Sequence, residues 1–198
     1  MNKITKIGCL FAAILLVCFC TACKKGGSGA PSGMKSASND DMGYTLYVPD
    51  DWMVMTGSGS LLSEARVSKE DSSNVTMAQY YGETEETGTA AVRKYFADYR
   101  ETLSKMFDAD KDGNPTMELL EKDGFETVMG KDNKQNDGGI PAIEYNYTAT
   151  LGGVELRYTQ VIAYHNGYYF IFTFTTTPGL YEKHASDVRN MIDNIAID

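Results

Sequence analysis

Cysteine, tryptophan and histidine are all scarce in this chain, and their scarcity excludes several kinds of site. All four cysteines lie within the first 23 residues, and there is one tryptophan. The rest of the chain can therefore form no disulfide, hold no metal through thiolates and offer no thiol nucleophile. The two histidines, His165 and His184, have no partner at the spacing of a metal site. We expect both to be surface or satisfied core residues rather than ligands or a base.

Basic residues are also too few for several functions. The 198-residue chain carries 18 Lys and Arg against 27 Asp and Glu, with a formal charge of −9. A nucleic-acid-binding protein needs a basic face to meet phosphates, so this class is excluded. The acidity also argues against electrostatic adhesion to anionic lipid, but it leaves covalent attachment to a membrane open. Hydrophobic residues make up 42% of the chain, enough for one domain with a real core.

The first 23 residues have the layout of a bacterial lipoprotein signal. Lys3 and Lys6 precede an apolar run, residues 7–19, that is too short to span a bilayer comfortably. The run ends in Cys20-Thr21-Ala22-Cys23, which resembles a lipobox whose peptidase cuts before an acylated Cys23. Cys20 departs from the usual Leu or Val at its position. The alternatives are an ordinary secretory signal or an uncleaved anchor.

This interpretation sets the expected location and domain boundaries. Two or three acyl chains on Cys23 would hold the protein stably at the outer face of the bacterial cell membrane, with the lipid bilayer as its partner. Residues 24–42 are rich in Gly, Ser and Ala, without periodicity, which is typical of a flexible tether. We therefore predict a signal peptide over 1–22, a lipidated Cys23 and tether over 23–42, and a globular domain over 43–198.

The strongest structural signal lies between Val154 and Thr176. Two apolar runs rich in β-branched and aromatic residues flank Asn166-Gly167, the pair typical of a tight two-residue hairpin turn. With this turn, His165 faces Tyr168, and alternation sorts the side chains onto two faces that are both too apolar for water. The sequence thus predicts a central hairpin covered on both sides.

The remaining periodicities predict the other elements. Residues 44–48, 61–69, 75–81, 125–131 and 143–147 read as strands. Apolar residues recurring at three and four predict an amphipathic helix over roughly 89–107 and a final helix opened by Pro178. A short helix is expected near 117–122. The expected fold class is α+β, an antiparallel sheet of about six strands flanked by two main helices.

Two stretches of this domain resemble the PsbP-like superfamily. They are GYTLYVPDDW, at residues 43–52, and GYYFIFTFTTTPGLYEKHASDVRNMIDNI, at residues 167–195. The superfamily includes the photosystem II protein PsbP, DcrB-type bacterial lipoproteins and a eukaryotic nuclear-import factor. The resemblance covers residues 43–198 and implies a PsbP-like α/β/α sandwich. It names no active site, because both motifs are structural and the members are mostly accessory or assembly proteins without catalysis.

One stretch after the long helix matches the opening of a calcium loop. Asp108, Asp110, Asp112 and Asn114 stand at alternate positions around Gly113, where carboxylates can converge on a hard cation. The closing glutamate is missing, because the twelfth position is Leu119. A loop of this kind would bind calcium only near millimolar affinity. The alternative is an acidic, solvated connection between helix and strand.

The thirteen tyrosines allow one further interpretation. Nine of them fall in expected strands and could line a concave face for a peptide or sugar. We favour the alternative, in which a sheet face packs under a helix with the hydroxyls at its rim.

Two functional hypotheses follow. The first is a membrane-tethered, non-catalytic accessory or binding protein with no cofactor beyond a weak calcium ion and an unidentified protein partner. The second is an extracytoplasmic hydrolase or small-molecule enzyme whose site is assembled from distant residues. We prefer the first, because no catalytic constellation is visible in the sequence.

Overall fold

The computed structural model describes residues 29–38 and 41–198. The predicted signal peptide, Cys23 and the first part of the predicted tether lie outside the described residues. In chain order the elements are β1 (Met34–Ser36), β2 (Tyr44–Thr45), β3 (Tyr47–Pro49), β4 (Met53–Val54), β5 (Leu62–Arg66), β6 (Asn74–Tyr81), α1 (Gly88–Ser104), β7 (Glu118–Leu119), β8 (Phe125–Met129), η2 (Lys134–Asn136), β9 (Ile140–Leu151), β10 (Val154–His165), β11 (Tyr168–Thr176), η3 (Pro178–Leu180), α2 (Tyr181–Asn194) and β12 (Ala196–Ile197).

The central hairpin predicted from the Asn-Gly pair is confirmed. His165 pairs with Tyr168 across the turn, and the register continues to Arg157 and Thr176. Asn166 and Gly167 both have positive φ, 49° and 83°. A turn of this hand suits the right-handed twist of the strands, and Asn and Gly tolerate it best.

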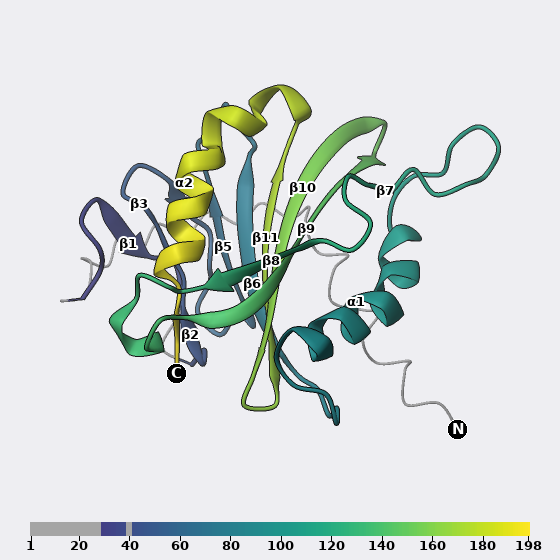
Figure 1. Ribbon diagram of the computed structural model, residues 1–198. Coiled ribbons are helices and arrows are strands. Elements are labelled where there is room, and N and C mark those ends of the chain that lie inside the picture. The colour runs from purple at the N-terminus through teal and green to yellow at the C-terminus, as the bar shows by residue number, and fades with distance from the viewer. Residues whose placement is uncertain (1–28, 39–40) are drawn as a thin grey trace.

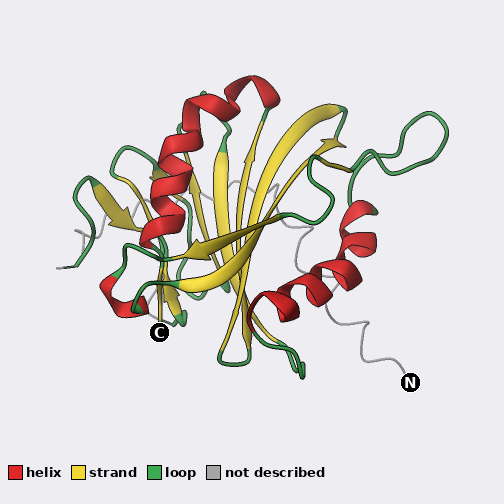
Figure 2. Cartoon of the chain, viewed as in Figure 1, coloured by secondary structure: helices red, strands yellow, loops and turns green. Residues whose placement is uncertain are grey.

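Eight of the strands form one large antiparallel sheet in the order β4-β5-β6-β11-β10-β9-β7, with β8 also paired to β9. The strand predicted over 44–48 is divided into β2 and β3, which pair with β12 and β1 in two separate two-stranded sheets. Six strands of the large sheet have five residues or more, whereas β4 and β7 have two each. The prediction of about six strands therefore found the long strands and missed the two short ones. Figure 2 shows that β9 and β10 curve along their length.

Two cores lie on opposite faces of this sheet. Successive residues of a strand point to opposite faces, so Val161 belongs to one core and Ile162 to the other. The first core contains Val188, Met191 and Ile192 of α2, and the second contains Ala91, Val92, Phe96, Tyr99 and Leu103 of α1. The two helices thus cover opposite faces, which makes an α/β/α sandwich (Figure 1).

The start of the domain needs a correction. Met34, Lys35 and Ser36 pair with Pro49, Val48 and Tyr47, and Met34 is buried in the first core. The ordered domain therefore begins before Gly43, and the second half of the predicted tether belongs to the fold. The Gly and Ser residues nearby hid this strand, because β1 is only three residues long and takes its stability from tertiary contacts.

The short helix expected near 117–122 is wrong. Glu118 and Leu119 instead form β7, paired with Thr148 and Tyr147 of β9. A segment this short follows the strand it can pair with rather than its own propensity. Of the helices that the described residues form, none is long and apolar enough to cross a membrane.

Candidate binding groove between α1 and β7

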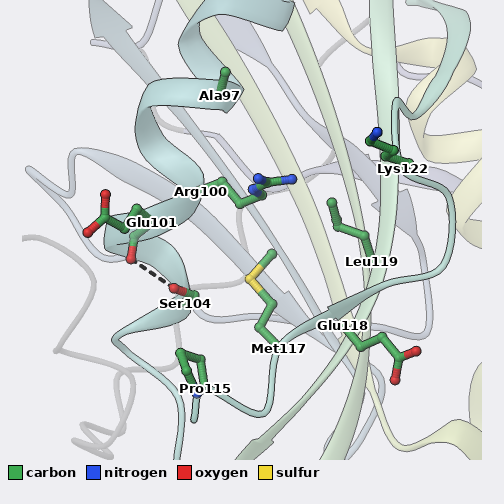
Figure 3. A pocket seen from close by; sticks show the side chains of 9 residues that line it. All are labelled: Ala97, Arg100, Glu101, Ser104, Pro115, Met117, Glu118, Leu119 and Lys122. Atoms are coloured by element: carbon green, nitrogen blue, oxygen red, sulfur yellow. Dashed lines mark hydrogen bonds between the residues drawn. The ribbon is translucent and has the colours of Figure 1, made fainter.

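An open groove runs between α1 and the segment that contains β7 (Figure 3). Its volume is about 720 Å³. None of the residues that line it is buried. They are Ala97, Arg100, Glu101, Ser104, Pro115, Met117, Glu118, Leu119 and Lys122.

Packing of α1 explains why the groove exists. The apolar stripe of the helix lies on the sheet, where the ring of Phe96 stacks on Tyr145. The neighbouring stripe, which contains Ala97, Arg100 and Ser104, faces sideways because residues three and four apart share one side of a helix. Opposite this stripe, the pairing of β7 with β9 places Met117 and Leu119 against the second core. The groove is the space between this flank of α1 and the edge of the sheet.

Charge inside the groove is unevenly distributed. The Glu101 carboxylate is held by Lys105 Nζ at 2.7 Å, and Glu118 points away from the cations in Figure 3. The side chains of Arg100 and Lys122 form no ion pair or hydrogen bond with any other described residue. Arg100 extends toward the middle of the groove and Lys122 lies across from it, with Leu119 between them (Figure 3). The groove therefore presents two available positive charges above an apolar floor.

The calcium-like residues take a different arrangement from a metal site. Asp108 Oδ2 accepts a hydrogen bond from Gly153 N at 2.8 Å, which fixes the loop to the β9–β10 turn. Asp110 Oδ1 accepts bonds from the backbone N–H groups of Asp112 and Asn114, at 2.9 and 2.8 Å. No group of three His, Cys, Asp or Glu side chains within the described residues could hold a metal ion. The structure thus does not bring these carboxylates together, and calcium binding stays a prediction.

Hydrogen bonds also set the titration of Asp110. The backbone and side-chain amides of Asn114 lower the pKa of the Asp110 carboxyl, because they stabilise its charged form. Asp110 therefore acts as the acceptor that shapes an exposed turn, and the bridge between Ala109 and Pro115 closes the loop at its base.

The tyrosine-rich face is packed under α1, as the favoured interpretation predicted. Tyr95 of α1 stacks on Tyr169 with the ring centroids 4.4 Å apart, and Tyr147 stacks on Tyr158 at 4.8 Å. Burial raises the pKa of Tyr158 to about 12 and that of Tyr147 well above its usual value. These rings form core rather than a concave ligand face.

One buried polar cluster resembles catalytic machinery in composition only. His184 Nε2 lies 2.9 Å from Asp71 Oδ2, and Ser73 N donates to Asp71 Oδ1 at 3.0 Å. Ser73 Oγ pairs with Thr176 Oγ1 at 2.7 Å, so the carboxylate lies between the serine and the histidine. In a catalytic site the nucleophile must be hydrogen-bonded to its base. The cluster instead fastens α2 to the loop before β6.

Packing and pKa are consistent with this structural role. His184 is 4% exposed and lies edge-on to Trp52. Burial alone would raise the pKa of Asp71, but hydrogen bonds from Ser73, His184 and Lys183 outweigh it and lower the pKa well below its usual range. The expectation that His184 is a satisfied core residue is confirmed.

Comparison with known proteins gives a fold. No protein-family model matches the chain, and no curated protein matches it in sequence. Among solved structures, cyanobacterial PsbP (CyanoP) from Synechocystis sp. PCC 6803 aligns with a TM-score of 0.54 and 11% identity, covering 88% of this chain and 98% of that one. The fold is PsbP-like.

Two further structures share this PsbP-like arrangement. One is PA94 from Pseudomonas aeruginosa, a protein of unknown function, with a TM-score of 0.51, 15% identity and coverage of 81% of this chain and 94% of that one. The other is LpqN, described as involved in cell envelope biogenesis of Mycobacterium tuberculosis, with a TM-score of 0.50, 16% identity and coverage of 83% and 90%. Identities this low establish the fold alone.

The groove residues escaped sequence reasoning. Arg100 lies in the long helix and Lys122 follows a strand that was expected to be a helix. No local signal could have found Lys122, because Glu118 and Glu126 stand four positions before and after it and would pair with it on a helical surface.

Proposed function

We propose that this chain is a lipid-anchored protein of the bacterial cell envelope whose PsbP-like domain is a non-catalytic accessory or binding module. The observation that carries the proposal is the Cys20-Thr21-Ala22-Cys23 sequence directly after a short apolar run. The structural likeness to LpqN, which is involved in cell envelope biogenesis, supports the same location.

The groove between α1 and β7 supports the second half of the proposal. An apolar floor with a few available polar groups can bind a ligand, whereas catalysis would require an acid, base or nucleophile in mutual contact. The two cations of the groove, Arg100 and Lys122, would attract and orient a negatively charged ligand.

Acylation of Cys23 is tested by substitution at the two cysteines of the lipobox. In the native bacterium, we expect the wild-type chain to incorporate an alkyne-tagged palmitate and to fractionate with membranes. Cys23→Ser should lose the label and accumulate unprocessed, because the thiol is the acylated atom. Cys20→Leu, the matched control, should keep the label, since leucine is usual at this position.

The proposal is overturned if Cys23→Ser retains the label or if the wild-type chain is released after cleavage without lipid. A released chain would be an ordinary secreted protein.

A further inference from the structure

Two cations face the same groove from elements that are far apart in sequence. Arg100 comes from α1 and Lys122 from the connection after β7, and neither meets a counter-charge within the described residues. In a chain with a net charge of −9, acidic residues were abundant enough to pair with them. At physiological ionic strength the Debye length is about 8 Å, so the local cations rather than the net charge govern a contact inside the groove.

The floor of the groove is apolar. Met117 and Leu119 are only partly buried although they pack against the second core, and Pro115 is exposed at the end opposite Lys122. Covering these side chains would remove apolar surface from water, at about 25 cal/mol per Å². The favourable ligand therefore combines negative charge with apolar groups.

The open shape of the groove favours a large ligand over a small molecule. A site for a small molecule encloses most of its ligand, whereas every residue that lines this groove remains at least partly exposed. An acyl chain or small anion would keep much of its surface in water. A segment of a larger partner can lie along the open groove, because the rest of the partner covers its outer side.

We propose that the α1–β7 groove binds an acidic, apolar segment of a partner protein. Apolar side chains of the segment lie on Met117 and Leu119, and its carboxylates meet Arg100 and Lys122. This rests on the proposed function, because it names the class of partner that the accessory domain would bind. Arginine can hold a carboxylate through two parallel hydrogen bonds, so Arg100 fixes orientation as well as charge.

The test uses a fluorescein-labelled peptide of about three helical turns, made of glutamate with leucine at every third or fourth position. Fluorescence anisotropy measures its binding to the mature chain held in phosphatidylcholine nanodiscs. We expect saturable binding that weakens about tenfold or more in the double variant Arg100→Glu/Lys122→Glu, and that weakens as salt is raised.

A matched double variant controls for net charge. Lys111→Glu/Lys134→Glu changes the charge equally at exposed lysines outside the groove, and it should bind the peptide within about twofold of wild type. Met117→Gln should weaken binding while both cations remain. Circular dichroism of each variant establishes that it is folded, and the single variants Arg100→Gln and Lys122→Gln replace the double if it is not.

Several results would overturn the proposal. One is an equal loss of peptide binding in the groove double variant and in the control double variant. The others are that a peptide with lysine in place of glutamate, or one with serine in place of leucine, binds the wild-type chain as tightly as the original peptide. Binding of the chain to phosphatidylglycerol vesicles through the same two cations, in preference to the peptide, would identify a lipid surface as the occupant instead. If Cys23 is not acylated, the same titration runs in free solution, so failure of the anchor does not obscure the groove result.

Discussion

Asp110 illustrates how one residue can fit two motifs. In the sequence it is the second carboxylate of a calcium-like loop, and in the structure its oxygens accept hydrogen bonds from the backbone of Asp112 and from Asn114. Asp residues commonly hold turns in this way, by bonding a backbone N–H two residues on. The sequence alone could not separate these roles, because both use the same spacing of acidic residues.

We predict that Asp110→Ala lowers the melting temperature in the presence of EDTA, because the turn loses its acceptor. Asp112→Ala should leave it nearly unchanged. Differential scanning calorimetry measures both. If a calcium site exists, the melting temperature of wild type shows a saturable rise at millimolar calcium, and both variants lose this rise. If Asp110→Ala has the same melting temperature as wild type in the absence of calcium, the role of Asp110 in the turn is rejected.

Asp71 is a second residue with a testable effect, because it makes the stability of the protein depend on pH in the acid range. Its pKa is lower in the folded chain than the unfolded value of about 3.9. The stabilisation it contributes is therefore complete above pH about 5 and is lost as the pH falls through and below the unfolded pKa. Asp71→Asn should destabilise the protein by about 1.5–3 kcal/mol at pH 7 and by less at pH 3, where part of the stabilisation has already been lost.

Urea unfolding at the two pH values measures this difference. Asp187→Asn is the control, since Asp187 is an exposed residue of α2, the helix that contributes His184 to the cluster. An equal loss of stability at pH 7 and pH 3 for Asp71→Asn would contradict the prediction.

At the scale of elements, prediction succeeded where local chemistry alone decides the conformation. The Asn166-Gly167 turn, the long helix and the aromatic strands carry their own signals in periodicity and turn residues. It failed for β1 and β7, which are three and two residues long. Their conformation comes from the strands they pair with, β3 and β9, and no local pattern records such a contact.

The correction at β1 leads to a test by truncation. A chain that begins at Gly43 loses β1, the buried Met34 and Ala37, and Ser38, whose Oγ bonds to Leu46 N at 2.8 Å. We expect it to be about 3 kcal/mol or more less stable than a chain that begins at Gly29, on the scale of removing one large buried apolar residue. Urea unfolding measures the difference, and equal midpoints would show that the segment before Gly43 adds nothing.

For the whole molecule, the PsbP-like sandwich places separate cores on the two faces of one sheet. Phe172 and Ile162 are both fully buried, but they belong to different cores. The sequence predicted that both faces of the central hairpin are covered, because neither set of alternating side chains is polar enough to be left in water. It could not predict the groove, since that requires the relative position of α1 and the sheet edge.

We predict that Phe172→Ala and Ile162→Ala destabilise the protein by about 3–5 and 2–5 kcal/mol. Phe172 pairs with Val161, the neighbour of Ile162, so the two sites share backbone although their side chains lie on opposite faces. We therefore expect an interaction energy of only about 0.5–1 kcal/mol, at the low end for nearby residues. Chemical unfolding of the single and double variants gives the interaction energy. A large non-additive term would mean that the two cores act as one.

The junction between Trp52 and His184 has a practical consequence. The chain has a single tryptophan, it is 2% exposed, and it lies against α2, with the ring centroids of Trp52 and His184 5.9 Å apart. Its intrinsic fluorescence therefore reports on one place only, the attachment of the C-terminal helix. A red shift of the emission before the loss of far-ultraviolet ellipticity would reveal α2 detaching from a sheet that is still intact, without any added label.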